Sequence, residues 1–266
     1  MRLTIATWNI NSVRLRADLV ARFLETEAPD LLCLQETKTP DELFPAEPFE
    51  ALGYRHQALT GQKGYHGVAI LSRVPFEGVD RRAYCGKGDA RHVTVGLPGG
   101  IELHNFYVPA GGDEPDRTIN EKFGHKLDFL TEMADTFAAC RRKDNRIVLV
   151  GDLNVAPLEH DVWSHKQLLT VVSHTPIEVE HLARVQDAHD FVDVTRQEIP
   201  EPEKVYTWWS YRARDWEASD RGRRLDHIWV TPALRNRAGN IRILKAARGW
   251  ERPSDHVPVL MELEAG

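Results

Sequence analysis

Short apolar runs alternate with polar segments along the whole chain. The runs are four to seven residues long, rich in Val, Ile and Leu, and bounded by turn or cap residues. Runs of this kind are typical of buried strands. We therefore expect strands at residues 3–7, 31–34, 68–71, 92–95, 101–107, 147–150, 225–230 and 257–260.

Three other segments have the three- and four-residue spacing of apolar side chains that indicates an amphipathic helix. Leu15, Leu19 and Phe23 have this spacing, and Pro29 ends the pattern, so we expect a helix at 14–27. A second helix is expected at 122–140, and a weaker pattern favours a third at 176–188. Strands interleaved with helices, without a repeat or a long linker, predict a single α/β domain over 1–266 in which helices cover two packed sheets.

Composition agrees with a globular enzyme. With 266 residues, of which 42% are hydrophobic, the chain can bury a substantial core. No apolar stretch approaches the 18 or so residues that a membrane span needs, so we expect a cytoplasmic protein without a membrane partner. The three cysteines are far apart in the sequence and predict neither a disulfide framework nor a zinc site.

Charge is distributed unevenly along the chain. The net charge is −6, yet residues 201–252 contain twelve Lys and Arg against seven Asp and Glu. A locally basic segment in an acidic chain favours a polyanionic substrate bound on one side.

Four polar motifs adjoin the predicted strands. They supply carboxylates, amides and one imidazole, which are groups that hold a divalent cation and activate water beside a phosphate. We expect them to converge at one edge of the sheets, as the site of a metal-dependent phosphodiesterase. The motifs are Trp8-Asn9-Ile10-Asn11, Gln35-Glu36-Thr37-Lys38, Gly151-Asp152-Leu153-Asn154 and Ser254-Asp255-His256.

Each motif side chain suggests a role. Glu36 follows a buried strand, where its carboxylate can be fixed, and is the first-choice ligand for magnesium or manganese. Asp152 and Asn154 lie two residues apart and so share a face, where they can orient a water and a phosphate. His256 can donate to a phosphoryl oxygen if Asp226 holds its other nitrogen. An isolated Asp after a strand is usually a turn residue, so the joint occurrence of the motifs carries the prediction.

The ordered motifs resemble the exonuclease III family of DNA-repair nucleases, within the endonuclease/exonuclease/phosphatase superfamily. The resemblance implies a four-layer αββα sandwich of two facing mixed sheets flanked by helices. It also implies hydrolysis of duplex DNA with Mg²⁺, for which Mn²⁺ can substitute. The implied activities are 3′ to 5′ exonuclease, removal of 3′-phosphates and incision at abasic sites, by a monomer acting on 3′ ends or lesions. Further matching segments are residues 62–69, 107–109, 207–212 and 224–226.

The resemblance also assigns site residues. Whether Asp152 or His256 takes the proton from the attacking water stays open, because coupled groups can share that role. The implied catalytic residues are Tyr107, Asp152, Asn154, Asp226 and His256. The implied metal-binding residues are Asn9, Glu36, Asp152, Asn154, Asp255 and His256. The implied DNA contacts are Lys38, Arg91, Trp208, Tyr211 and Arg223.

Three departures from the family pattern predict how the activities are balanced. Ala110 stands where members commonly carry an amide after the Tyr-x-Pro motif, and Arg223 replaces a bulky apolar residue of the abasic-sugar pocket. The loop 156–175 lacks the asparagines of strong abasic endonucleases and contains His160, His165 and His174 instead. We therefore expect 3′-end processing to dominate and abasic incision to be weak.

Two other functions have to be weighed. The same fold could act on a phospholipid, an inositol phosphate or another small phosphate ester, but the basic segment and the tryptophans favour DNA, and no membrane anchor is evident. A non-catalytic DNA-binding module is the second alternative. It is disfavoured because every catalytic side chain of the pattern is present.

Overall fold

Two six-stranded mixed sheets form the centre of the computed structural model, which describes residues 1–266. The strands are β1 (Arg2–Asn9), β2 (Leu31–Gln35), β3 (His56–Thr60), β4 (Val68–Ser72), β5 (Gly78–Asp80), β6 (His92–Leu97), β7 (Ile101–Tyr107), β8 (Arg146–Asp152), β9 (Val192–Asp193), β10 (Trp208–Trp209), β11 (Gly222–Arg223), β12 (Asp226–Val230), β13 (Ala238–Ile243) and β14 (Val259–Glu264). The first sheet has the order β13-β14-β1-β2-β4-β3, the second β5-β6-β7-β8-β12-β9, and β10 pairs with β11 alone.

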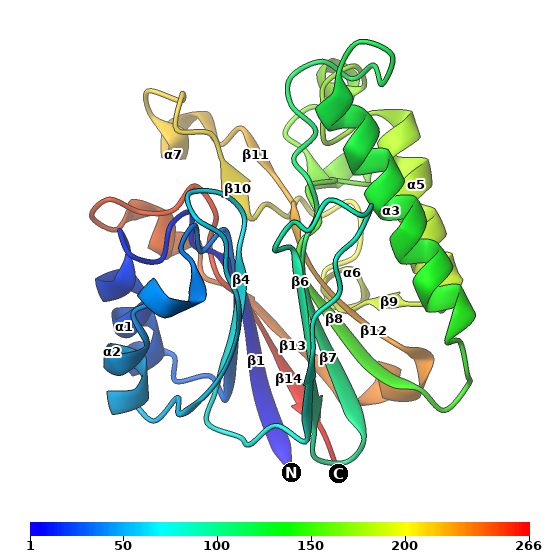
Figure 1. The fold of residues 1–266 in the computed structure, drawn as a ribbon. Coiled ribbons are helices and arrows are strands. Elements are labelled where there is room, and N and C mark those ends of the chain that lie inside the picture. The colour runs from blue at the N-terminus through cyan, green and yellow to red at the C-terminus, as the bar shows by residue number, and fades with distance from the viewer.

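Helices cover the outer faces of both sheets, so the predicted four-layer sandwich is confirmed (Figure 1). The α-helices are α1 (Ala17–Thr26), α2 (Ala46–Ala51), α3 (Glu121–Ala139), α4 (His165–Leu168), α5 (Pro176–Ala188), α6 (Val194–Glu198) and α7 (Trp216–Ser219). The 3-10 helices are η1 (Asp41–Leu43), η2 (Glu159–Asp161), η3 (Pro232–Arg237) and η4 (Lys245–Gly249). α1 and α2 lie on the first sheet, and α3 and α5 on the second. None of the helices has the length and hydropathy that crossing a bilayer requires.

The largest hydrophobic cluster lies between the two sheets and contains 24 buried residues from both. Smaller clusters lie under the helices, with Phe129 and Phe137 of α3 in one and Val20 and Phe23 of α1 in the other. β2 and β4 have the second sheet on one side and the helices on the other, so both of their faces are buried. This explains why their sequences are continuous apolar runs. The sandwich therefore holds its central strands rigidly, and the site lies at their ends.

The helix ends follow from local sequence. α3 begins after Asn120, whose side chain accepts hydrogen bonds from the backbone N–H groups of Lys122 and Phe123. α5 begins with a capping box in which Thr175 and Glu178 satisfy each other's backbone N–H groups, followed by Pro176 in the first turn. The predicted third helix at 176–188 is confirmed with these bounds.

Several predicted boundaries were wrong. α1 begins at Ala17 and not at residue 14, because Arg16 turns back to bind the carbonyls of Ile10 and Asn11. The strand predicted at 257–260 is β14, which begins at Val259 and continues to Glu264. The edge strands β3, β5 and β13 were missed. Their residues are largely half-buried or exposed, so they lack a continuous apolar run.

A buried charge network under the site fixes the second sheet to its loops. The Arg224 guanidinium makes two hydrogen bonds with the Asp161 carboxylate, at 2.7 and 2.8 Å, and one with Asp193 at 2.7 Å. It also donates to Nδ1 of His227 at 3.1 Å, while Nε2 of His227 donates to the Val155 carbonyl at 2.8 Å. His227 is therefore held as the neutral ring. Burial, followed by the adjacent Arg224 charge, lowers the pKa of His227 to about 4.

This network predicts a loss of stability in mild acid. In the unfolded chain the pKa of a histidine is about 6.5, so between that pH and about 4 the unfolded state binds a proton that the folded state excludes. The contribution of His227 to stability is complete above about pH 6.5 and decreases as the pH falls. We expect the free energy of unfolding to drop by about 2 kcal/mol between pH 6.5 and 5 through this residue. Urea unfolding of the wild type and of His227→Gln across this range measures it.

His181→Gln, which changes a histidine on α5 outside the network, is the matched control. The His227 variant should show a shallower pH dependence than both the wild type and this control. Equal slopes in all three proteins would contradict the assignment.

Candidate active site

The carboxyl ends of parallel strands from both sheets meet at one end of the sandwich, opposite the two chain termini (Figure 1). Asn9 ends β1, and Glu36 follows the parallel strand β2. In the second sheet, Tyr107 ends β7 and pairs in register with Asp152 at the end of the parallel strand β8. Asp226 begins the antiparallel strand β12 opposite Asp152. This topology brings together side chains that are far apart in the sequence.

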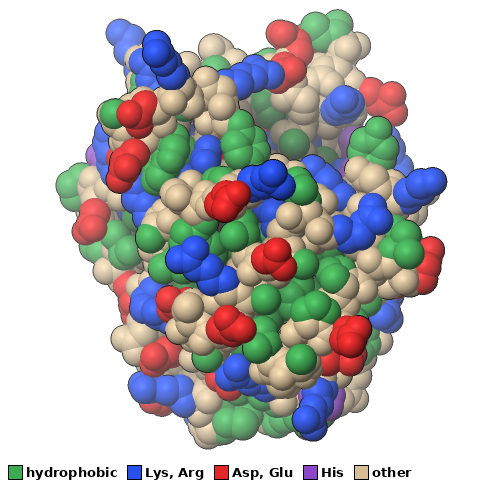
Figure 2. Space-filling view, turned by 90° about the vertical axis from the view of Figure 1, so that its left-hand side faces the viewer, with side chains coloured by type: hydrophobic (Ala, Val, Ile, Leu, Met, Phe, Trp, Pro, Cys, Tyr) green, Lys and Arg blue, Asp and Glu red, His purple; other side chains and the backbone are tan.

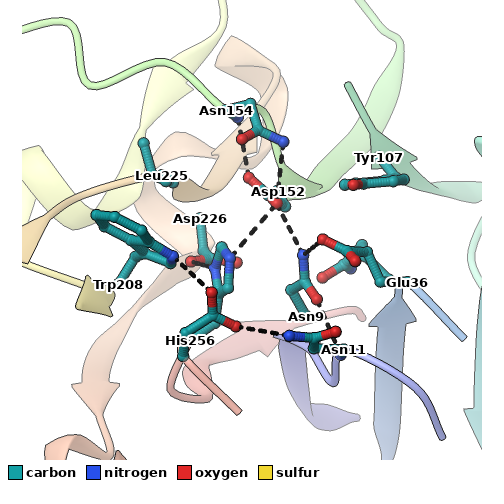
Figure 3. A network of polar contacts seen from close by, with 12 residues as sticks. Asn9, Asn11, Glu36, Tyr107, Asp152, Asn154, Trp208, Leu225, Asp226 and His256 are labelled. Atoms are coloured by element: carbon teal, nitrogen blue, oxygen red, sulfur yellow. Dashed lines mark hydrogen bonds and ion pairs between the residues drawn. The ribbon is translucent and has the colours of Figure 1, made fainter. Parts of the chain in front are cut away.

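Asn9 connects the two sheets at the site (Figure 3). Its Nδ2 atom donates to Oε1 of Glu36 and to Oδ2 of Asp152, each at 2.9 Å. The two carboxylate oxygens are therefore no more than twice that distance apart. The predicted convergence is confirmed for the first three motifs.

His256 lies between two carboxylates. Its Nδ1 atom is 2.8 Å from Oδ2 of Asp226, as predicted, and its Nε2 atom is 3.7 Å from Oδ2 of Asp152. Burial disfavours the charged ring, but the Asp226 and Asp152 carboxylates outweigh it and raise the pKa of His256 to about 10. The ring is therefore an imidazolium at neutral pH.

Asp152 is an almost fully buried carboxylate of the site. Its Oδ1 atom accepts a hydrogen bond from the backbone N–H of Asn154 at 2.9 Å, and its Oδ2 atom accepts from the side-chain amides of Asn9 and Asn154. Burial raises the pKa of Asp152 to about 7, although the positive charge of His256 opposes the shift. A carboxyl group with this pKa can both accept and release a proton near neutral pH.

Glu36 and Asp255 line the side of the site nearest the first sheet. Glu36 forms an ion pair with Lys38 at 2.8 Å, and Lys38 also donates to Oδ1 of Asn11 at 2.6 Å. Asp255 accepts hydrogen bonds from Nδ2 of Asn11 at 3.1 Å and from Nε1 of Trp208 at 2.9 Å. Lys38 thus contacts the predicted metal ligand, and Trp208 is fixed by Asp255.

Tyr107 lies over a buried arginine. The Arg91 guanidinium is 4.9 Å from the Tyr107 ring centroid and donates to the Tyr107 carbonyl, and it forms an ion pair with Asp89 at 3.1 Å. Arg91 is 6% exposed, so it supports Tyr107 from within the protein, and its contact with DNA remains a prediction. Burial and the neighbouring Glu36 and Asp152 raise the pKa of Tyr107 well above its usual value, which keeps the hydroxyl protonated.

The donor set fits a divalent cation. Asn9, Glu36, Asp152 and Asp255 offer carboxylate and amide oxygens, the ligands that hard cations prefer. One buried oxygen, Oδ1 of Asp226, has no hydrogen-bond partner. Asp152, Asp226 and His256 also have ligand atoms within 4.8 Å of one another. Because a hydrogen bond joins His256 to Asp226, this trio can hold a proton, and the oxygens around Glu36 are available to a cation.

A cavity of about 670 Å³ adjoins these residues. Its acidic end contains Glu36, Asp152 and Asp255, and its walls include Trp163, Trp208, Leu225, Arg212, Arg221 and Arg223. Arg221 lies 4.6 Å from the Trp163 ring centroid, and Arg223 lies 5.2 Å from that of Trp208. Tyr211 is 48% exposed nearby, with its hydroxyl donating to the Pro253 carbonyl.

Two predicted metal ligands differ in their surroundings. The side-chain nitrogen of Asn154 donates to the Val108 carbonyl and to Asp152, which leaves its oxygen available to a cation, whereas both ring nitrogens of His256 face carboxylates. The three histidines of loop 156–175 do not form a cluster. His165 and His174 contact each other at 2.8 Å, whereas His160 pairs with Glu201.

Sequence reasoning missed several buried supports of the site. Lys126 of α3 donates to the Asn154 carbonyl at 2.7 Å and forms a buried ion pair with Glu178. Arg16 binds the carbonyl of Arg252 and the Tyr211 hydroxyl, so it joins three loops. Asn11, which bonds to Asp255 and Lys38, belongs to the first motif, so its place in the site could have been predicted. Lys126 and Arg16 have no local sequence signal, because their partners are distant in the sequence.

Comparison with known proteins identifies the family. The sequence profile of the Endonuclease/Exonuclease/phosphatase family matches residues 6–256. The chain belongs to this family. Exodeoxyribonuclease III of Haemophilus influenzae is 31% identical over 97% of this chain and 98% of its own length. The predicted resemblance to the exonuclease III branch of this family is thus confirmed. The prediction that the protein is a hydrolase is confirmed with it.

Solved structures of the family agree with the fold. An AP endonuclease from Archaeoglobus fulgidus has a TM-score of 0.91 and 32% identity, over 98% of this chain and 99% of that one. A 3′ phosphatase from Neisseria, NExo, solved with a product DNA hairpin, has a TM-score of 0.89 and 30% identity, over 98% and 99% of the two chains. Members of the endonuclease/exonuclease/phosphatase family with different named activities therefore share this architecture.

Proposed function

We propose that this protein is a DNA-repair phosphodiesterase that hydrolyses duplex DNA from the 3′ end, as a 3′ to 5′ exonuclease and 3′-phosphatase, with abasic incision as a weaker activity. The observation that carries the proposal is the convergence of Glu36, Asp152 and His256 at one site, with Asn9 bridging the first two. The exodeoxyribonuclease III and 3′ phosphatase names of its relatives support the substrate.

The proposed cofactor is Mg²⁺, with Mn²⁺ as a substitute, because the donor atoms of Glu36, Asn9 and Asp255 are oxygens. When bound, the cation would neutralise charge on the phosphate. Asp152 and His256 divide the proton transfers. Since the pKa of Asp152 is raised to about 7 and that of His256 to about 10, Asp152 is the group suited to accept the proton of water. His256 is suited to donate a hydrogen bond to a phosphoryl oxygen.

Charge on the molecular surface supports a locally bound polyanion. Over the face that α1 and α2 cover, acidic and basic side chains are interspersed (Figure 2). Beside the site, by contrast, Arg212, Arg221 and Arg223 line one cavity. We further propose that residues 1–266 form a single domain and that the protein acts on duplex DNA as a monomer. The cytoplasmic location remains a prediction from the sequence.

A matched set of duplexes tests the proposal. One carries a 3′-phosphate, one a 3′-hydroxyl and one an internal abasic analogue, and each is incubated with the purified protein in Mg²⁺. We expect loss of the 3′-phosphate and shortening from the 3′ end, with abasic incision at least about 10-fold slower because Arg223 replaces an apolar pocket wall. Excess EDTA should abolish all three reactions. Faster cutting at the abasic site would refute the ranking, and no hydrolysis of any duplex would refute the function.

A further inference from the structure

Arg223 is a largely buried cation without an acidic partner. Its Nη1 atom donates to the Val172 carbonyl at 2.9 Å and to Oγ of Ser173 at 2.7 Å, and its Nε atom is buried without any hydrogen-bond partner. The neighbouring Arg224, by contrast, has two carboxylate partners, Asp161 and Asp193. A buried guanidinium that keeps an unused N–H is costly unless something else supplies the acceptor.

The open side of Arg223 faces the cavity of the active site. Both Arg223 and the catalytic pair Asp152 and His256 line this cavity. Trp208 lies between the two ends, because its Nε1 atom binds Asp255 while its ring lies 5.2 Å from the Arg223 guanidinium carbon. The cavity therefore has a carboxylate end, an indole wall and a guanidinium end.

The chemistry of the guanidinium end selects among occupants. An uncharged sugar or alcohol placed there would remove water from Arg223 without providing a counter-charge. A carboxylate or phosphate oxygen would supply the missing counter-charge and accept a charge-assisted hydrogen bond from Nη2, the guanidinium nitrogen that is neither buried nor bonded within the protein. At about 670 Å³ the cavity has room for a second anionic group beside the phosphate that is hydrolysed.

We infer that Arg223 binds a second anionic group, a carboxylate or a phosphate, carried by the blocked 3′ end of the substrate. DNA ends with such a group are processed in preference to neutral blocks of the same size. This inference rests on the proposed function, because a DNA terminus must enter the cavity.

Three duplexes that differ only in the 3′ block test the inference. One ends in a 3′-phosphoglycolate, which carries a carboxylate, one in a 3′-(2-phosphoethyl) phosphate, and one in the neutral 3′-(2-hydroxyethyl) phosphate. The quantity measured is the ratio of kcat/KM for each charged block to kcat/KM for the neutral block. For the wild type we expect a ratio of about 10 or more. The charged block with the higher ratio identifies whether carboxylate or phosphate fits better.

Arg223→Gln should bring both ratios to about one, and Arg223→Lys, which keeps the charge but not the guanidinium, should give intermediate values. Arg235→Gln is the matched control, because it makes the same change at an exposed arginine of η3 that does not line the cavity, so its ratios should stay near those of the wild type. A ratio rather than a rate is the readout, since a merely structural defect would slow all three substrates alike.

A wild-type ratio near one for both charged blocks would overturn the inference, whatever the variants do. An unblocked duplex separates this failure from that of the proposed function. If the wild type shortens the unblocked duplex and the ratios are one, the role of Arg223 alone is wrong. If no duplex is hydrolysed, both proposals are wrong.

Discussion

Asp152→Asn is expected to lower kcat on a 3′-phosphate duplex by roughly 1,000- to 10,000-fold while the protein remains folded. The substitution keeps the size of the side chain and the acceptor for the Asn154 backbone N–H, but the amide cannot take a proton from water. It also removes the carboxylate that faces Nε2 of His256. Steady-state and single-turnover assays in Mg²⁺ measure the loss.

The same variant should stay folded but be less stable than the wild type when the metal is chelated. A neutral amide removes the cost of burying the carboxylate, but its N–H group then faces the side-chain amides of Asn9 and Asn154, which donate to Oδ2 in the wild type. Thermal unfolding in EDTA checks this. Asp144→Asn, an exposed change in the turn before β8, is the control and should alter neither activity nor melting temperature. If Asp152→Asn kept more than about a tenth of the wild-type kcat, Asp152 would not be the group that accepts the proton of water.

Asp226→Asn is expected to lower kcat by about 100- to 1,000-fold and to move the alkaline limit of activity downward. The Asp226 carboxylate is the main charge that raises the pKa of the buried His256 to about 10. Without that charge the pKa falls, so the imidazolium is lost at a lower pH, and with it the hydrogen-bond donor to the phosphoryl oxygen. The wild type should stay active to about pH 9, whereas the variant should lose activity well below that pH.

A kcat profile from pH 6 to 10 distinguishes this role from a structural one. General damage to the site would reduce the rate at all pH values without moving the limit. Glu217→Gln, an exposed acidic residue of α7, serves as the control for changes in overall charge. An unchanged alkaline limit in Asp226→Asn would show that Asp226 does not set the protonation of His256.

The layered fold could be predicted because its central strands are buried on both faces and stand out as apolar runs. β7 was predicted with its observed bounds, and α5 likewise. The edge strands could not be found in this way. β13 alternates exposed and half-buried residues and contains a register shift between Gly239 and Arg242, so its periodicity is broken.

The pairing of Asp226 with His256 was also predictable, because both side chains adjoin strands in recognisable motifs. The catalytic roles of these residues remain predictions. The supporting cations were not predictable. Lys126 contacts Glu178 and the Asn154 backbone across 52 and 28 residues of sequence, and such contacts exist only once the helices have packed. Likewise, no sequence pattern indicated that Arg91 bonds to Asp89 and to the Tyr107 carbonyl, and its contact with DNA remains a prediction.

The position of the Asn9 amide has a consequence for recombining relatives into chimeric enzymes. A crossover that takes one sheet from each parent would bring the Glu36 side and the Asp152 side from different ancestors, so that the Asn9 amide would bridge carboxylates of unlike origin. Such hybrids should fold whenever the interior volumes match, yet lose turnover if the halves are offset by an ångström. Crossover points that keep both halves from one parent, and exchange only the outer helices, are the ones that should preserve catalysis.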